Sequence, residues 1–356
     1  METGTSADFD VVVVGGGPSG ALSALKCAEL GFKVLILERE PGRSKPCGGL
    51  LTPSCKSVLS ELLRMEIPSD LMCSPAFLKV LYVSPNFKER GCMKNFRLLN
   101  LRRGLFDKWL RGLAAEAGAN IWYRTSFIKL AGLEPIQIIA RRDNQTIKVR
   151  ARYLIGADGV YSRVRSQLYP NKKVETALVL QEYWRADGNF QGCFYVFLRG
   201  ELTSAYSYVI PKDALIVVGF FAPKMNYTTL KARVEIFKKL LREELHFELH
   251  SLKRREVWAV PYGFILEGVG NIVLVGDAGG FCNTLTGEGI KYALESALAA
   301  AKSVREAASS KENLASLYRE KVIELSSFLK KVHQLATSLT DEDRRQFVNF
   351  VCAKHC

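Results

Sequence analysis

FDVVVVGGGPSGALSALKCAELGFKVLILERE, residues 9–40, carries the pattern from which the architecture of the chain follows. Four consecutive valines open the segment, and such β-branched residues favour a strand. Apolar residues then recur at helical spacing, and KVLILE predicts a second strand. A strand, a glycine-rich turn, a helix and a second strand together predict the opening unit of a doubly wound parallel sheet.

The glycine-rich turn of this segment predicts a binding site for phosphate groups. Its glycines permit a tight turn and a close approach of the backbone to a pyrophosphate, and the helix that follows offers free N–H groups. Glu38, at the end of the second predicted strand, is placed to accept a hydrogen bond from a ribose hydroxyl. An acidic residue at this position fits FAD or NAD better than NADP.

Two later segments also follow predicted strands with glycines: GADGVYSRVR, residues 156–165, and GDAGGFCNTLTGEGIKYALES, residues 276–296. Together with the first turn, and in this order, they resemble the motifs of FAD-dependent oxidoreductases of the p-hydroxybenzoate hydroxylase type. Asp277 is expected to accept a hydrogen bond from a ribityl hydroxyl. The helix that begins near Gly289 is expected to stabilise the negative charge of reduced flavin.

The resemblance implies FAD as the cofactor, with a binding site drawn from all three motifs and from two segments between them. For Arg103, in RRGLFD, the alternative is a surface arginine before a helix, and for Asp158 the alternative is a turn cap. The expected cofactor-binding residues are Gly15, Gly17, Pro18, Ser19, Gly20, Glu38, Arg39, Cys47, Gly48, Gly49, Arg103, Asp158, Gly159, Gly276, Asp277, Gly287, Gly289 and Ile290.

KPCGGLLTP, residues 45–53, and YSYVIPK, residues 206–212, resemble two signatures of the geranylgeranyl reductase family within this superfamily. In the second signature Tyr208 stands where the family has tryptophan, and Ile210 stands where it has phenylalanine. The resemblance implies a catalytic role for Cys47, Tyr206 and Tyr208, and substrate contacts from Tyr206, Tyr208, Pro211 and Lys212.

Each of these roles has a structural alternative. Cys47 could be a packing thiol, because free cysteines are more often packing residues than reagents. The two tyrosines could belong to a strand core, and Lys212 could be a strand-end charge in place of a contact to a phosphate head group.

The predicted fold is α/β, with a Rossmann-like FAD-binding domain, an inserted antiparallel-sheet substrate domain and C-terminal helices. We assign residues 1–53, 100–170 and 265–305 to the discontinuous FAD-binding domain. Residues 54–99 and 171–264 form the predicted substrate domain, and 306–356 a helical region.

The function that the resemblance implies is FAD-dependent reduction of carbon–carbon double bonds in a polyprenyl chain carried by a lipid, a quinone or a diphosphate. A flavin-dependent aromatic monooxygenase or halogenase shares the same three motifs and is the first alternative. A non-catalytic prenyl-binding chaperone is the alternative from another class. No second glycine fingerprint follows a strand, so electrons are expected from NAD(P)H or from a redox carrier such as ferredoxin.

Composition narrows the cellular setting. The 356 residues are 48% hydrophobic, and no apolar run reaches the roughly 18 residues that a membrane span needs. The first ten residues lack a basic region, so no secretory signal is expected, and nine scattered cysteines indicate a reducing compartment without a metal site. The net charge of +14 comes in short interrupted groups, and no recognition motif or aromatic platform accompanies them, so no nucleic acid is expected as a partner. A basic surface equally fits an anionic membrane surface or a phosphorylated substrate, and charge alone does not choose between them. We therefore expect a cytoplasmic protein with peripheral association at the inner face of the cell membrane.

Overall fold

The computed structural model describes residues 6–40, 42, 45–190 and 192–355. The chain divides into two compact units, each built from three separated segments. The first unit comprises Met1–Ser44, Gly104–Glu175 and Pro261–Val332, and the second comprises Lys45–Arg103, Thr176–Val260 and His333–Cys356. The fold class expected from the sequence, a Rossmann-like domain with an inserted sheet and C-terminal helices, is confirmed.

The unit boundaries differ most from the sequence-based ranges in two places, and elsewhere by five residues or fewer. Residues 45–53 lie in the second unit, because Leu50 and Leu51 pair with Asn100 and Leu99 in its sheet. The C-terminal helices do not form a region of their own, since the division between the units falls after Val332.

The first unit is built on a sheet whose central strands are parallel. The strand order is β15-β16-β9-β1-β2-β6, with a hairpin of β7 and β8 added beside β9. The parallel pairs are β1 with β2 and β9, β9 with β16, and β2 with β6. The strands are β1 (Ser6–Val14), β2 (Val34–Leu37), β6 (Asn120–Trp122), β7 (Thr125–Leu133), β8 (Ile136–Arg142), β9 (Gln145–Gly156), β15 (Gly268–Val269) and β16 (Ile272–Leu274).

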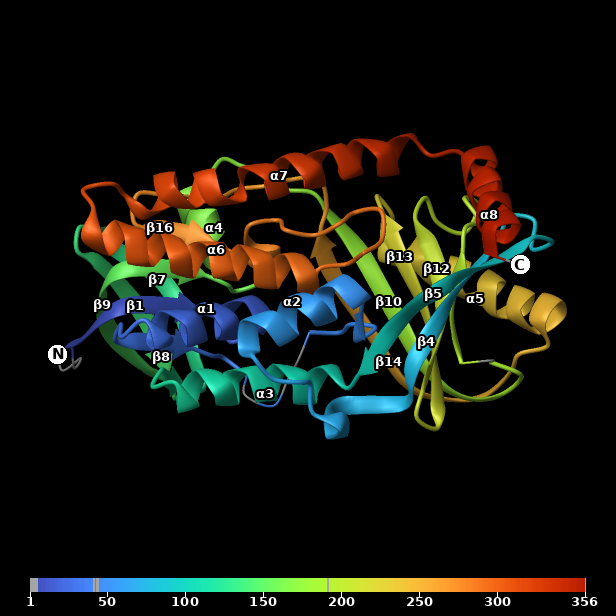
Figure 1. The fold of residues 1–356 in the computed structure, drawn as a ribbon, viewed down its shortest axis with the longest axis horizontal. Coiled ribbons are helices and arrows are strands. Elements are labelled where there is room, and N and C mark those ends of the chain that lie inside the picture. Colours follow the sequence, from blue (N-terminus) through green and yellow to red (C-terminus); the bar gives the residue numbers. More distant parts are fainter. Residues whose placement is uncertain (1–5, 41, 43–44, 191, 356) are drawn as a thin grey trace. The chain divides into compact units, whose positions relative to one another are not determined.

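Helices cover this sheet, and the sequence explains where they begin. In α1 the first helical residue is Pro18, whose missing N–H costs nothing at that position. Figure 1 shows α1 beside α6, and α7 packs on α6 through Tyr292 and Phe328, whose ring centroids are 6.3 Å apart. The helices are α1 (Pro18–Glu29), α3 (Arg103–Glu116), α4 (Arg163–Leu168), α6 (Ile290–Ser309) and α7 (Leu314–Ser338).

The second unit contains a larger sheet of order β14-β10-β13-β12-β11-β4-β5-β3. The pairs β10–β13, β13–β12, β12–β11, β4–β5 and β5–β3 are antiparallel, as expected, whereas β4 and β11 run parallel. The elements are β3 (Leu50–Leu51), α2 (Pro53–Leu63), β4 (Met72–Val83), β5 (Arg90–Leu101), β10 (Thr176–Asp187), β11 (Cys193–Phe197), β12 (Tyr206–Lys212), β13 (Leu215–Pro223), α5 (Tyr227–Leu245), β14 (Glu248–Pro261) and α8 (Asp341–His355).

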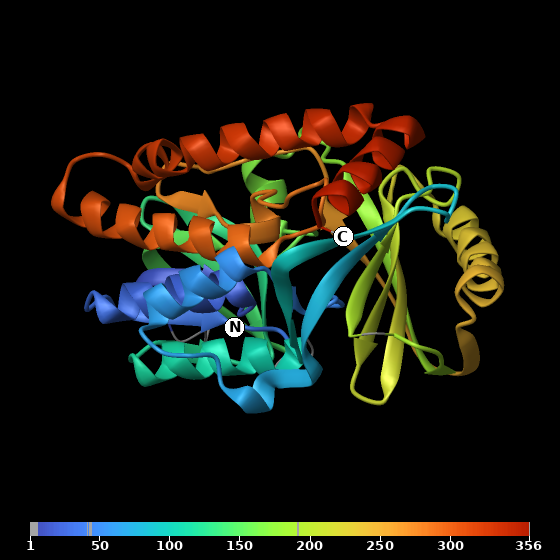
Figure 2. The same ribbon diagram turned by 45° about the vertical axis from the view of Figure 1, so that its right-hand side comes forward.

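Helix α5 covers one face of this second sheet (Figure 2). Asn226 caps the helix by accepting a hydrogen bond from the Thr229 N–H at 2.9 Å. Its apolar stripe buries Phe237, whose ring centroid lies 4.9 Å from that of Phe197 and 5.3 Å from that of Phe220. This aromatic cluster forms the core of the second unit.

The opposite face of the second sheet carries a different apolar set, rich in tyrosine. At its far end α8 packs along β5, and the Phe347 ring meets the Tyr82 ring edge-on at 4.9 Å. One cluster of buried and half-buried side chains on this face forms what we call the tyrosine face: Leu50, Leu78, Tyr183, Phe194, Tyr206, Tyr208, Ile210 and Val217.

In the part of the chain that the structure describes, no helix combines the length and the apolar composition needed to cross a membrane.

Truncation of Phe237 tests the packing of α5. Phe237→Ala should cost about 3–5 kcal/mol, because it removes a fully buried ring, and should lower the urea midpoint of the second unit. Ile236→Ala is the matched control, since the neighbouring side chain is 41% exposed and should change stability by less than about 0.5 kcal/mol. Equal midpoints for the two variants would contradict this packing.

Candidate active site

The glycine turn after β1 is held close to the end of β9. Gly15 has a φ of 101°, and a Cβ atom there would lie 2.4 Å from the Ala157 carbonyl oxygen. Only glycine tolerates both this conformation and this distance. The turn therefore brings the start of α1 next to the GADG segment that follows β9.

Glu38, which follows β2, holds the same turn through a hydrogen bond. Its Oε2 atom accepts a hydrogen bond from the Gly16 N–H at 2.7 Å, and its Oε1 atom accepts one from the Glu40 N–H at 2.8 Å. Each carboxylate oxygen can accept a second hydrogen bond, so both remain able to receive ribose hydroxyls. Arg39 is exposed and pairs with Glu40 at 3.1 Å.

The N-terminus of α1 fits a pyrophosphate. Gly17 is its N-cap residue, and no side chain caps the helix. A Cβ atom on Gly17 would meet nothing within 4 Å, so space is open on that side of the turn. An uncapped helix end that faces open space is a favourable position for an anion. The Ser19 side chain lies on the other side, against Gly276, and so joins the first motif to the third.

Arg111 in α3 is a residue that sequence reasoning missed. Its Nη1 atom donates a hydrogen bond to the Gly16 carbonyl oxygen at 3.0 Å, and the side chain is buried. The prediction had named Arg103, which stands two helical turns earlier and is half-buried. Within the first unit it is Arg111 that contacts the glycine turn after β1, which we call the phosphate turn. A cofactor contact from Arg103 stays a prediction.

Asp158 caps α4. Its carboxylate accepts hydrogen bonds from the Ser162 hydroxyl at 2.5 Å, the Arg163 N–H at 2.7 Å and the Val164 N–H at 3.2 Å. Desolvation nevertheless raises the pKa of Asp158 above its usual value. The capping alternative is thus observed, and a contact between Asp158 or the adjacent Gly159 and the cofactor stays a prediction.

Arg165 joins the second motif to the third. Its Nη2 atom donates to the Val160 carbonyl at 2.6 Å, and its Nη1 atom donates to the Ala278 carbonyl at 3.0 Å. The guanidinium also lies 5.0 Å from the centre of the Phe264 ring. Arg165 stands inside the quoted GADGVYSRVR motif, but its position in the motif does not reveal which carbonyls it reaches.

The third motif places a carboxylate beside the start of α6. Gly289 is the N-cap residue of α6 without a side-chain cap, and Ile290 is the first helical residue. A Cβ atom on Gly289 would lie 3.7 Å from Asp277 Oδ1, so the aspartate and the helix end adjoin. Gly287, just before them, has a φ of 68°. The first unit thus gathers its predicted residues at the carboxyl ends of β1, β2, β9 and β16, where such sheets bind ligands.

In the second unit the Cys47 loop lies beside β12. The Gly49 N–H donates a hydrogen bond to Cys47 Sγ at 3.3 Å, and the cysteine is half-buried. The Cys47 sulfur lies close enough to Tyr208 and Lys212 that its charge affects the pKa of both. Gly48 faces Ile210, since a Cβ atom on Gly48 would lie 3.0 Å from Ile210 Cδ1.

Tyr208 is held by a relay of side chains. Gln181 Nε2 donates to the Tyr208 hydroxyl at 2.8 Å, and the Tyr183 hydroxyl donates to Gln181 Oε1 at 3.4 Å. The ring lies on Gly219, where a Cβ atom would come within 2.2 Å of it. Burial raises the pKa of Tyr208 well above its usual value, so the phenol stays protonated at neutral pH.

Tyr206 continues the aromatic surface. Its ring centroid lies 5.8 Å from that of Tyr208, and Phe194 lies 6.0 Å from Tyr208 on the other side. All three belong to the tyrosine face, which is apolar except for the hydroxyl groups. Tyr206 and Phe194 are half-buried, whereas Tyr208 is buried.

Lys212 donates to groups of the protein itself. Its Nζ atom lies 2.7 Å from Asn100 Oδ1, 2.8 Å from the Leu101 carbonyl oxygen and 3.6 Å from Cys73 Sγ. Asn100 in turn donates to the Pro211 carbonyl at 2.9 Å. Desolvation lowers the pKa of Lys212. These contacts make Lys212 an internal cation beside the Cys47 loop and lend no support to a phosphate head group.

Sequence patterns could have pointed to two further residues of the second unit. Gly219 interrupts the apolar run ALIVVGFF, and a glycine inside a strand often marks a close approach of another group. Gln181 is a polar residue that directly follows the apolar run ALVL, residues 177–180. Neither pattern identifies Tyr208 as the partner, because strand register decides that pairing.

Replacement of Glu38 tests the ribose contact. Glu38→Gln should weaken FAD binding about 10- to 100-fold, since a hydrogen bond to a charged acceptor contributes about 1.5–3 kcal/mol. Titration of the apoprotein with FAD, followed by flavin fluorescence, measures the effect. Glu116→Gln, at the exposed end of α3, is the control and should bind as the parent does. An unchanged affinity in Glu38→Gln would exclude the contact.

Several solved structures share this fold. A Thermoplasma acidophilum protein described as geranylgeranyl bacteriochlorophyll reductase-like gives a TM-score of 0.82 at 24% identity, covering 98% of this chain and 92% of that chain. The flavin-dependent halogenase CmlS gives 0.74 at 17% identity, covering 97% and 70%. The p-nitrophenol 4-monooxygenase PnpA from Pseudomonas putida DLL-E4 gives 0.73 at 16% identity, covering 98% and 94%.

Sequence comparison identifies the family. The model of the FAD dependent oxidoreductase family matches residues 10–189, and that of the FAD binding domain matches residues 105–320. Protein CbrA of Escherichia coli O9:H4 (strain HS) is 30% identical over 302 residues, which are 81% of this chain and 79% of that protein. Protein CbrA of Shigella sonnei (strain Ss046) is also 30% identical over 302 residues, 81% of this chain and 82% of that protein. The expected cofactor, FAD, is confirmed, and the chain belongs to the family of FAD-dependent oxidoreductases.

Proposed function

We propose that this oxidoreductase reduces carbon–carbon double bonds of a polyprenyl chain. The observation that carries the proposal is the meeting of the two signature segments: the Cys47 loop lies beside Tyr208 of YSYVIPK, on an apolar aromatic face. The Thermoplasma acidophilum protein of the same fold is described as geranylgeranyl bacteriochlorophyll reductase-like, and this description supports the proposal.

The tyrosine face suits an isoprenoid chain. It combines the half-buried rings of Tyr206 and Phe194 with buried apolar side chains behind them, Tyr208 and Ile210. A chain of isoprene units has no hydrogen-bonding groups, so it gains most from apolar contact. Aromatic faces also stabilise the positive charge that develops when a proton reaches an alkene.

Saturation of an isolated alkene requires a hydride on one carbon and a proton on the other. Bound FAD, in its reduced form, would supply the hydride. The substrate has no carbonyl group to hold the second charge, so the protein must provide a positioned proton donor. The donor is to be found among the residues that adjoin the tyrosine face.

We assign the proton to the Cys47 thiol. Transfer of the proton to the alkene carbon leaves a thiolate, and the Gly49 N–H already points at this sulfur at 3.3 Å. The Lys212 ammonium is a second stabilising group, because it interacts electrostatically with the same sulfur. Gln181 donates to the Tyr208 oxygen, so the hydrogen of the Tyr208 hydroxyl is free to point away from Gln181. Tyr208 therefore provides both a ring surface and a protonated hydroxyl.

Anaerobic turnover tests the reaction class. Protein reduced with dithionite, or supplied with NAD(P)H or reduced ferredoxin, should convert geranylgeranyl lipids into products heavier by whole pairs of hydrogen atoms. Mass spectrometry of the extracted lipids measures this change. A monooxygenase or halogenase would instead require oxygen. A prenyl-binding chaperone would retain the lipid unchanged, and either result would contradict the proposal.

Substitution of Cys47 tests the proton donor. Cys47→Ala, assayed with FAD bound, should lower the turnover rate by about 10²- to 10⁴-fold, the usual contribution of a positioned general acid. Cys92→Ala provides the matched control, because Cys92 is also a half-buried cysteine of the second unit. Full turnover by Cys47→Ala with FAD bound would remove the thiol from the mechanism.

A further inference from the structure

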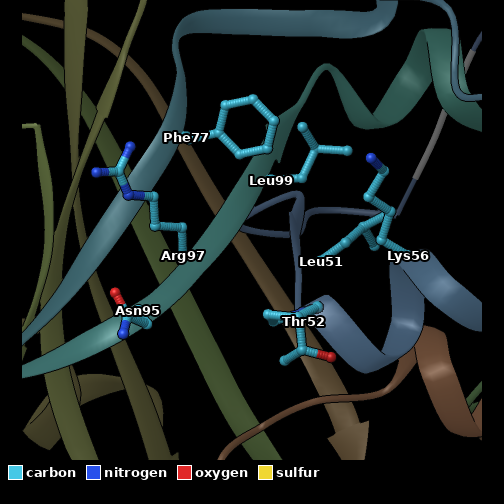
Figure 3. Close-up of a pocket in the computed structure, with 8 residues that line it drawn as sticks. Leu51, Thr52, Lys56, Phe77, Asn95, Arg97 and Leu99 are labelled. Atoms are coloured by element: carbon cyan, nitrogen blue, oxygen red, sulfur yellow. The ribbon is translucent and has the colours of Figure 1, made fainter.

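A groove on the second unit lies at the junction of α2 with the hairpin of β4 and β5. Its volume is about 510 Å³, which is within the usual range for small-ligand sites. Figure 3 shows Phe77 and Leu99 next to each other, with Arg97 and Lys56 on opposite sides of them. The lining residues are Leu51, Thr52, Pro53, Lys56, Phe77, Asn95, Arg97 and Leu99.

The groove combines an apolar floor with an exposed aromatic ring. Leu51 and Leu99 are almost fully buried, whereas Phe77 is 47% exposed although it pairs directly with Leu99 across the two strands. An exposed phenylalanine beside basic side chains is typical of surfaces that bind at the boundary between lipid head groups and acyl chains.

The charged residues that line the groove are both basic. Its lining contains Lys56 and Arg97 but no acidic residue, and Arg97 lies opposite Lys79 in the register of β4 and β5. Like charges directly opposite each other in a sheet are destabilising. Among the residues that the structure describes, Lys79 and Arg97 have no ion pair with a carboxylate, whereas Lys56 pairs with the exposed Glu66 at 3.1 Å.

The surrounding segment has the same sign. Residues 45–103 contain ten lysines and arginines against four aspartates and glutamates. An anion in the groove would relieve the repulsion between Lys79 and Arg97, and an attached apolar chain would cover Phe77. The complementary ligand is therefore both anionic and amphipathic.

We propose that the groove binds the head group of an anionic phospholipid and docks the hairpin of β4 and β5 on an anionic membrane surface. Phe77 enters the boundary with the acyl chains, and Arg97 contacts the phosphate from the lining of the groove, while Lys79, opposite Arg97 on β4, adds a second positive charge beside it. The inference goes beyond the reductase reaction and does not depend on it.

Vesicle flotation tests the docking surface on the intact, FAD-loaded protein. The parent should bind vesicles of phosphatidylcholine with 30% phosphatidylglycerol and should not bind pure phosphatidylcholine. Binding should weaken with added salt, because salt screens surface charges. Arg97→Gln should lower the partition constant about fivefold, and the double variant with Lys79→Gln about 25-fold, since each basic residue near such a surface contributes about 1 kcal/mol. Phe77→Ser should lower it about fivefold or more without changing the salt dependence.

Arg141→Gln is the matched control, because Arg141 is also an exposed strand arginine but lies in β8 of the first unit. It should bind within twofold of the parent, and unchanged flavin absorbance should show that every variant is folded. Equal binding of the parent to neutral vesicles, or equal losses in Arg97→Gln and Arg141→Gln, would overturn the proposal. Release by inorganic phosphate at matched ionic strength would also overturn it, since the groove would then be a site for free phosphate. The assay measures no turnover, so its failure would leave the reductase proposal standing.

Discussion

Gly16 is held by hydrogen bonds to both its backbone N–H and its carbonyl group, and the conformation of the phosphate turn depends on these two bonds. Glu38 accepts the N–H at 2.7 Å, and Arg111 donates to the carbonyl at 3.0 Å. Glu38 directly follows β2 and Arg111 belongs to α3, so hydrogen bonds connect the turn to two separate elements. Because Gly15 also presses against Ala157, the turn has little freedom to rearrange. A binding site that is rigid before the ligand arrives loses less entropy on binding.

In the second unit the buried hydroxyl of Tyr208 requires a hydrogen-bond partner, and the side chain of Gln181 is that partner. A phenol enclosed in an apolar sheet costs free energy unless it is hydrogen-bonded. Tyrosine at position 208, where the geranylgeranyl reductase signature that the segment resembles has tryptophan, therefore requires an amide or similar group nearby, and Gln181 provides one at 2.8 Å. Gly219 leaves room for the ring to lie flat on β13. The three residues act as one constraint, although they lie on three strands.

The sequence predicts the first unit well because its motifs are short and local. The spacing of Gly15 and Glu38, for example, spans one βαβ unit and needs no knowledge of distant contacts. Prediction is weaker where a partner lies far along the chain. Arg111 and Arg103 stand on the same helix, and only the packing of α3 decides which of them reaches the phosphate turn. Likewise, the pairing of residues 50 and 51 with β5, which moves the Cys47 loop into the second unit, is a two-residue ladder with no sequence signal of its own.

Lys212 shows how a residue can serve a site without contacting the ligand. Three acceptors of the second unit surround its ammonium group, so the charge is fixed in place rather than mobile. Desolvation lowers its pKa, while the nearby thiols of Cys73 and Cys47 act in the opposite direction. A thiolate that formed at Cys47 would therefore meet a cation already in position, without side-chain reorganisation. Such preorganised charge is worth more than a flexible surface lysine, because no solvent has to be displaced at the moment of reaction. In the proposed reduction, the lysine of the signature thus acts on the sulfur and not on the substrate.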